Sequence, residues 1–174
     1  MKNWRNHLGL VVPLLVIIGM AIWPALSGSV SNRESIFTIL KAIALASSLN
    51  ILLGYTGYVS FGHIVFYGFG GYVGLYLVNG LGWSIWAGML MGGIASAILA
   101  YVLGKAILRL RGAYFALATI GINEAMKAFV NNFDLFGGPI GMTLNFSVYK
   151  SYGGAAQALN MAFYIMAGLT AIAL

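Results

Sequence analysis

The chain has 174 residues, of which 61% are hydrophobic and 7% are charged. Soluble domains carry about 25% charged residues, so this composition excludes an ordinary soluble protein and predicts an all-α integral membrane protein with about five or six spans. There is no cysteine, which excludes disulfides and cysteine-bound metals. The net charge of +6 includes no basic run of the kind that binds nucleic acid.

The first apolar run covers residues 8–26 and follows Lys2 and Arg5. A basic start, an apolar middle and small residues after it also describe a signal peptide. The length of the run and the further apolar segments behind it favour a retained first helix. A short polar loop at 27–35 then leads to a predicted second span at 36–53.

Residues 54–74, GYTGYVSFGHIVFYGFGGYVG, are too polar and too rich in glycine for a helix that faces lipid. Irregular backbone at membrane depth is tolerated only where protein buries it or where it lines a wet cavity. We therefore expect a break or re-entrant turn at 54–63, a return helix at 64–78, and a transport path beside the break. The candidates for the path or its gating in this segment are Gly54, Gly57, Ser60, Gly62 and His63.

Each polar residue of the break also has a simpler interpretation. His63 either makes a structural hydrogen bond or contacts a substrate, and the structural bond is the simpler reading. For Ser60 and Thr56, the simpler interpretation is that their hydroxyls cap backbone groups and do not bind a ligand. The glycines permit unusual dihedral angles and close packing.

A tight turn is expected at 79–82 and a fourth span at 83–103, with Trp83 and Trp86 at the membrane interface. This segment carries a small residue at every fourth position. Such a stripe lets a second helix approach closely, so it predicts a packed bundle and carries no functional meaning of its own. The members of the stripe are Gly88, Gly92, Ser96, Ala100 and Gly104.

Lys105, Arg109 and Arg111 follow within a short predicted loop. Because positively charged loops remain in the cytoplasm, this loop sets the orientation and places the amino terminus in the cytoplasm as well. A fifth span at 112–130, an outer loop at 131–154 and a sixth apolar run at 155–174 complete the chain. The last run ends without a flanking charge, so we expect the chain to be the amino-terminal part of a longer protein.

Glu124 is the strongest candidate for a functional residue in the fifth span. It lies about 12 residues into the span, roughly 18 Å along the helix axis. A carboxylate at that depth is costly and needs a partner, and Lys127 lies on the same face three residues on. One interpretation is that this pair fixes the helix in the bundle; the other is a part in substrate passage or gating.

The sequence offers no enzyme chemistry. No spacing indicates a Ser–His–carboxylate set, paired carboxylates or a metal-ligand cluster. The glycines between 68 and 74 miss the dinucleotide-binding pattern, and there is no P-loop. We therefore predict no catalytic residue, no metal site and no cofactor.

Three blocks of sequence resemble one known family. Residues 50–72, NILLGYTGYVSFGHIVFYGFGGY, are similar to an early membrane segment of the branched-chain amino acid permeases of ATP-binding cassette importers, and most of all to their M-type subunit. Residues 109–124, RLRGAYFALATIGINE, and the FGGPIGM loop within 132–142 resemble two later segments of the same family. The positions that match are Gly54, Gly57, Ser60, Gly62, His63, Gly112, Glu124, Gly137, Gly138 and Gly141, whereas Tyr58 and Pro139 depart from the usual pattern.

The resemblance implies a permease subunit of the bacterial inner membrane that forms one transmembrane domain over residues 1–174 and continues beyond it. Its partners would be a second permease, two cytoplasmic ATPases that hydrolyse the ATP, and a periplasmic substrate-binding protein. It would move branched-chain amino acids by alternating access, although related importers carry urea or short amides. Two alternatives stay open: a passive channel for a small neutral solute, and a shortened chain without transport of its own.

Overall fold

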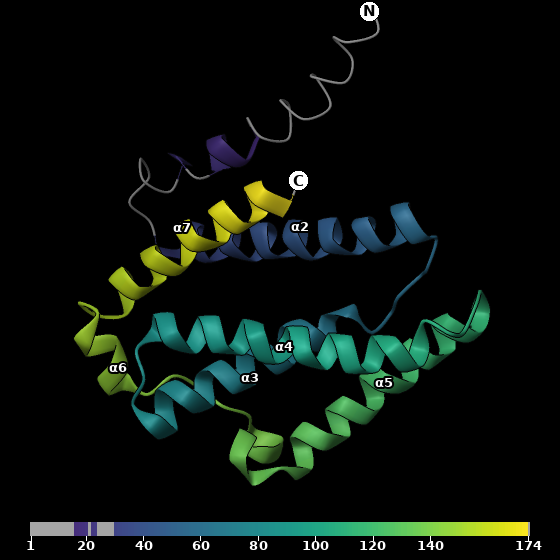
Figure 1. Cartoon of the computed structure of the whole chain (residues 1–174). Coiled ribbons are helices and arrows are strands. Elements are labelled where there is room, and N and C mark those ends of the chain that lie inside the picture. Colours follow the sequence, from purple (N-terminus) through teal and green to yellow (C-terminus); the bar gives the residue numbers. More distant parts are fainter. Residues whose placement is uncertain (1–15, 21, 24–29, 174) are drawn as a thin grey trace, which may run out of the picture. The chain divides into compact units, whose positions relative to one another are not determined.

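A computed structural model describes residues 16–20, 22–23 and 30–173, and all regular structure in them is helical, as predicted (Figure 1). Four of the described helices are long and apolar enough to cross a membrane, namely α2, α3, α4 and α7, which makes the protein a polytopic helical membrane protein. The elements are α2 (Val30–Thr56), α3 (His63–Leu81), α4 (Ile85–Ile107), α5 (Ala113–Asn132), η1 (Asp134–Phe136), η2 (Gly138–Ile140), α6 (Phe146–Ser151) and α7 (Ala155–Ala173).

The predicted first span is described only in part. Residues 16–20 and 22–23 are helical. The rest of the 8–26 run lies outside the described residues, and so do Lys2, Arg5 and the choice between a retained helix and a signal peptide.

The chain divides into two compact units, and the first contains the described residues up to Asn50 together with those from Tyr149 onward. Its core joins α2 to α7, because Leu40 and Phe163 are almost completely buried and pack with Ile17 and Ala167. Thr170 is buried as well, and its hydroxyl donates to the carbonyl oxygens of Met166 at 2.7 Å and Leu40 at 3.3 Å. The polar group of this core is thereby satisfied, as burial requires.

The second unit, Ile51–Val148, is built on a hairpin of α3 and α4. The turn begins later than predicted, because α3 continues through Asn79 to Leu81 and ends on Gly82, whose φ of 67° is left-handed. Ser84 then caps α4 by accepting a hydrogen bond from the Ala87 amide at 3.3 Å. Glycine at a left-handed helix end and serine at an N-cap are the residues that these positions favour.

Small residues on both helices allow α3 and α4 to pack with their backbones close together. A Cβ placed on Gly70 would lie 2.9 Å from the Gly92 carbonyl oxygen, and one on Gly88 would lie 3.0 Å from the Gly74 oxygen. One turn further, the Ser96 hydroxyl donates to the Phe66 carbonyl oxygen. The contact is therefore made by two facing rows with a period of four, which is how membrane helices approach most closely.

The fifth predicted span forms the helix α5, but it is not among the four helices that are apolar enough to cross a membrane. Asn123, Glu124 and Lys127 interrupt its apolar sequence. The helix begins after Gly112, which has φ of 59° and ψ of −131°. That region of backbone space is essentially restricted to glycine.

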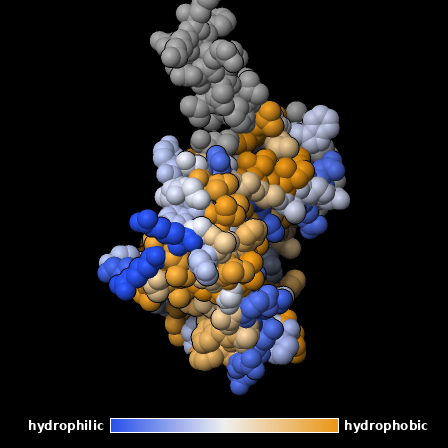
Figure 2. Space-filling view, turned by 90° about the vertical axis from the view of Figure 1, so that its right-hand side faces the viewer, coloured by the Kyte–Doolittle hydropathy of each residue, from blue (hydrophilic) through white to orange (hydrophobic). Residues whose placement is uncertain are grey.

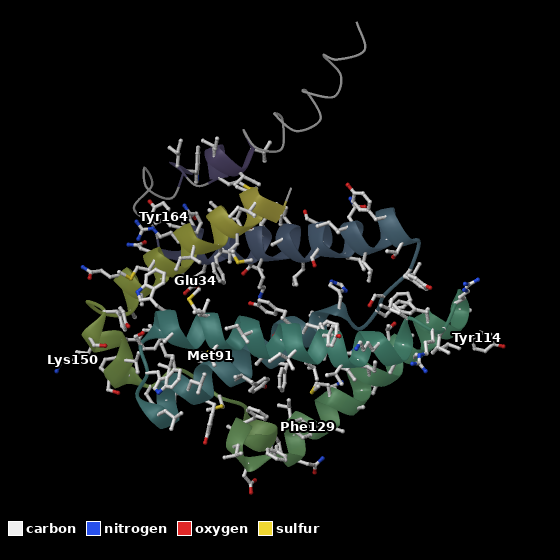
Figure 3. All side chains as sticks on the ribbon, in the orientation of Figure 1. Glu34, Met91, Tyr114, Phe129, Lys150 and Tyr164 are labelled. Atoms are coloured by element: carbon white, nitrogen blue, oxygen red, sulfur yellow. The ribbon has the colours of Figure 1, made fainter. Side chains whose placement is uncertain are left out.

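The predicted outer loop at 131–154 contains η1, η2 and α6 and is partly packed against the unit. Phe136 is buried, and the rings of Tyr72 on α3 and Phe129 on α5 lie 5.8 Å and 6.1 Å from its ring (Phe129 is labelled in Figure 3). Asn79 fixes the next part of the loop, since its amide donates to the Thr143 carbonyl oxygen at 2.9 Å and its oxygen accepts from the Asn145 amide at 3.1 Å.

Large apolar side chains remain exposed over much of the surface, including Leu90 (68%) and Ile98 (60%) on α4. The space-filling view shows hydrophobic surface extending between smaller hydrophilic patches (Figure 2). Such a surface is expected where lipid or other membrane helices replace water as the neighbour.

Candidate functional site

The helical break lies at residues 57–62, inside the predicted 54–63. Gly54 is still helical and exposed, because the α2 hydrogen-bond ladder continues until the Gly57 amide donates to the Leu53 carbonyl oxygen at 2.9 Å. Gly57 has a left-handed φ of 71° and turns the chain out of the helix. The Thr56 hydroxyl bonds to the Leu52 carbonyl oxygen and accepts from the Tyr58 amide at 3.4 Å, so Thr56 caps the helix end as expected.

The break is held against α5 by Thr119. The Thr119 hydroxyl accepts a hydrogen bond from the Phe61 amide at 3.1 Å and donates to the Ala116 carbonyl oxygen at 2.8 Å. The Thr119 side chain is 5% exposed. The buried Thr119 hydroxyl thus pairs an amide that has no partner in the broken helix. The hydroxyl is also paired itself, as a buried polar group requires.

Gly62 is the closest point of backbone contact between the break and α5. A Cβ on Gly62 would lie 2.6 Å from the Thr119 carbonyl oxygen. The φ of Gly62 is −103°, which other residues adopt readily, so it is the close approach that requires glycine. Ser60 is 5% exposed beside it. Two predicted site residues, Ser60 and Gly62, are therefore buried, and Gly62 lies where the break meets α5.

Tyr58 anchors the start of the break. Its ring lies 4.6 Å from the ring of Phe115 on α5, with 44° between the planes. Its hydroxyl donates to the Leu108 carbonyl oxygen at 3.4 Å. Tyr58, Phe61 and Gly62 together fix the irregular segment to α5 and to the turn before it.

His63 is the first residue of α3 and not the last residue of the break. Its Nδ1 atom is buried and has no hydrogen-bond partner within the described parts of the chain. The Gly62 N-cap supplies no side-chain hydrogen bond to the helix end. The structural hydrogen bond that was the simpler expectation for His63 is therefore not made by Nδ1.

Glu124 forms the predicted pair with Lys127. The Lys127 Nζ and Glu124 Oε2 atoms are 3.9 Å apart, and the two side chains are 68% and 64% exposed. The burial that was expected for this carboxylate is thus not provided by the chain's own described helices. The pair lies more than one helical turn beyond Thr119 along α5.

Only part of the stripe of small residues on α4 packs against α3. Gly88, Gly92 and Ser96 lie against α3, whereas the nearest neighbour of a Cβ on Gly104 would be Leu108 at 3.8 Å. Ala100 is partly buried.

Among the basic residues, Lys105 is in the last turn of α4 and not in the loop. Its Nζ atom is 4.5 Å from the centre of the Tyr101 ring. Arg109 and Arg111 follow in the turn and are exposed.

Sequence reasoning missed two parts of this arrangement. Thr119 was not singled out, because its partner Phe61 is 58 positions away and no local pattern joins them. Gly70 and Gly74 were judged only against a nucleotide-binding pattern. Their spacing of four matches the α4 stripe and was the available signal that the two helices face each other.

Two curated relatives carry the name high-affinity branched-chain amino acid transport system permease protein LivM. The one from Salmonella typhimurium is 32% identical to this chain over 130 residues, and the one from Escherichia coli is 30% identical over 130 residues. Each match covers 74% of this chain and 30% of the relative, so the chain spans about 30% of the length of these relatives. No solved structure matches the chain significantly.

The model of one protein family, described as the permease component of branched-chain amino acid transport systems, matches residues 33–174. This range contains the break, the α3–α4 hairpin, α5 and the glycine-rich loop after it. It places the chain among membrane transport subunits and not among enzymes. The chain therefore belongs to the family of branched-chain amino acid transport system permease components.

Proposed function

We propose that this chain forms part of a permease subunit that carries branched-chain amino acids across a bacterial inner membrane by alternating access, as one component of an ATP-binding cassette importer. The observation that carries the proposal is the family match over residues 33–174, which includes the whole broken segment. The multi-pass helical fold supports it, and so do the curated relatives that share about a third of its residues over the matched region.

The partners in this proposal are a second permease subunit, two cytoplasmic ATPases and a periplasmic substrate-binding protein. The chain itself carries no P-loop, so the ATP would be hydrolysed by other subunits. The basic residues Lys105, Arg109 and Arg111 support an orientation with the α4–α5 turn in the cytoplasm. An odd number of spans before this turn would leave the amino terminus on the outside, whereas a retained first helix would make the number even and put the amino terminus in the cytoplasm.

The transport path in this proposal runs beside the break. An amino acid needs polar partners for its ammonium and carboxylate groups, and the unwound backbone of a broken helix provides them at membrane depth. Ser60 is buried there, and the Nδ1 of His63 has no partner in the described chain. Gly57 and Gly62 supply the backbone geometry of the break, Gly54 lies in the last turn of α2 before it, and Glu124 is the candidate for gating.

Uptake of labelled leucine tests the proposal. The full-length gene is expressed with its permease, ATPase and binding-protein partners in cells that lack their own importer. Leucine uptake that requires both the ATPases and the binding protein is the expected result. A well-expressed complete complex without leucine uptake contradicts the assigned substrate.

The same assay separates the importer from the alternative of a passive channel. Broken helices and glycine-rich segments also occur in channels. A channel would conduct a small neutral solute when the ATPases are inactivated, whereas the importer stops. Solute flux that continues with inactive ATPases would therefore favour the channel.

The assay also tests the part of Glu124. The Glu124 side chain is exposed within this chain, and its ion pair with Lys127 is long, at 3.9 Å, so we expect Glu124→Gln to leave the protein folded in the membrane. If Glu124 acts in gating, leucine uptake falls at unchanged expression, and Lys127→Gln, which breaks the same pair, serves as the matched variant. Normal uptake by Glu124→Gln removes this residue from the path.

A further inference from the structure

The turn between α4 and α5 presents three cations within seven residues of sequence. Lys105 lies in the last turn of α4, and Arg109 and Arg111 lie in the turn that follows. All three are exposed. Their role in orienting the chain does not say what the side chains bind once the protein is in place.

The backbone that carries these cations is well fixed. The Leu108 amide donates to the Gly104 carbonyl oxygen at 2.9 Å, and the Leu110 amide donates to that of Ile107 at 2.9 Å. The Leu108 carbonyl oxygen accepts from the Tyr58 hydroxyl at 3.4 Å. At its far end the turn closes on Gly112 in its glycine-specific conformation. The cations are thus held on a structured turn and not on a loose loop.

The unit offers these cations no carboxylate. Its acidic residues are Glu124, which pairs with Lys127, and Asp134 in η1, beyond the far end of α5. Glu124 is 11 residues into α5 from Ala113, about 17 Å along the helix. No ion pair of Lys105, Arg109 or Arg111 occurs within residues 30–173. Three neighbouring positive charges without a counter-ion favour an anionic ligand.

The surroundings of the cations have the composition of a membrane interface. α4 is long and apolar enough to cross a membrane, so its end lies near the headgroups. Tyr101 is 64% exposed and Tyr114 74% exposed, and the Tyr114 side chain points away from the ribbon (Figure 3). Leu108 and Leu110 are exposed between them. Tyrosine and exposed leucine beside Lys and Arg are typical of the depth at which acyl chains meet phosphates.

We propose that Lys105, Arg109 and Arg111 form a binding site for the phosphate of an anionic phospholipid, with Tyr101 and Tyr114 seated among the headgroups beside it. Arginine binds a phosphate through two parallel N–H donors, and basic residues next to a membrane span attract anionic lipid. A membrane is favoured over a protein partner because exposed tyrosine and leucine stand beside the cations at the end of a helix long enough to cross a membrane. The site is independent of the transported solute.

Binding of fluorescent phosphatidylglycerol to the purified full-length protein in a neutral detergent tests the proposal, with phosphatidylcholine, a zwitterionic lipid without net charge, as the reference. The test variant carries Lys105→Gln, Arg109→Gln and Arg111→Gln together. The control variant carries Lys127→Gln and Lys150→Gln, which remove cations outside the site. A third variant, Arg109→Lys with Arg111→Lys, keeps the positive charge but loses the two parallel N–H donors of arginine.

The proposal predicts that the wild type and the control prefer phosphatidylglycerol equally. One removed cation weakens binding about fivefold, and three weaken it on the order of a hundredfold. The lysine variant binds more weakly than the wild type and more tightly than the glutamine variant. Because lost positive charge also disturbs membrane insertion, single Gln variants and the salt dependence of wild-type binding provide the same test in protein of normal topology.

Three outcomes overturn the proposal. One is equal binding of both lipids by the wild type. Another is full phosphatidylglycerol binding by the triple Gln variant, above all if that variant no longer copurifies with the ATPases, since the surface would then belong to a protein partner. The third is displacement of the lipid by millimolar inorganic phosphate alone, which would mark a site for a free anion.

Discussion

Thr119 connects α5 to the broken segment through its side chain and its backbone. Its hydroxyl accepts from the Phe61 amide, and its carbonyl oxygen lies against Gly62. Thr119→Val keeps the shape of the side chain and removes the acceptor. The Phe61 amide is then left unpaired, which costs about 1–3 kcal/mol. We expect a lower unfolding temperature of the purified protein and a severalfold lower rate of leucine uptake.

Thr119→Ser is the matched variant, because it keeps the hydroxyl and loses only a methyl group. It should retain most of the uptake that Thr119→Val loses. If both variants transport equally well at equal expression, the hydrogen bond to Phe61 does not position the break, and the importance of Thr119 is limited to packing.

At the scale of the elements, the α3–α4 hairpin depends on the rows of small residues. A Cβ on Gly92 would meet the Gly70 carbonyl oxygen, whereas a Cβ on Gly93 would meet nothing within 4 Å. Gly92→Ala therefore forces the helices apart and should destabilise the unit by about 1–3 kcal/mol. Gly93→Ala, one position away in the same helix, should stabilise it by roughly 0.5–1 kcal/mol.

Thermal unfolding of the two variants in detergent compares these effects directly. The unfolding temperature should fall for Gly92→Ala and rise or stay constant for Gly93→Ala. Equal shifts in both variants would mean that the close approach of α3 and α4 contributes little to stability.

The elements that the sequence predicted well are those with a strong local signal. Apolar length located α4, α7 and the body of α2, and the glycines at 54–74 located the break to within three residues at its start. The predicted polar loop at 27–35 was wrong from Val30 onward, because α2 begins there and not at residue 36. The α3 helix extends past Asn79 because a single polar residue does not end a helix when Gly82 can close it. The short helices of the 131–154 loop went unpredicted because they depend on packing around Phe136 and on the hydrogen bonds of Asn79.

The candidate site was predictable in its residues and not in its contacts. Ser60, Gly62 and His63 were named from composition at membrane depth. Their neighbour Thr119 comes from another helix, and the pairing of residues 58 positions apart is a property of the fold. For Glu124, depth along the span predicted a costly carboxylate within the membrane, and within this chain the helix face on which it lies is exposed.

At the scale of the molecule, the chain forms two compact units, and the break lies in the second of them. Residues 33–174, which the family model matches, run through both. The proposed path therefore uses irregular backbone that is held at three points, by Tyr58, Phe61 and Gly62. A segment anchored in this way can move together with α5 during alternating access.

The most direct test is the accessibility of a cysteine at position 60. The 174 residues contain no cysteine, so Ser60→Cys adds a single reactive thiol to this region. The assembled importer in proteoliposomes is treated from both sides with a charged, membrane-impermeant thiol reagent, with and without ATP and leucine. Ile140→Cys, at a position that is 96% exposed, reports the intrinsic reactivity.

Ser60 is 5% exposed in the structure, so its labelling requires the path to open. Our account predicts that Cys labelling at position 60 depends on the nucleotide state and is slowed by leucine, while labelling at position 140 is constant. If position 60 is unlabelled in every state while uptake is normal, the break is static packing and the transport path lies elsewhere.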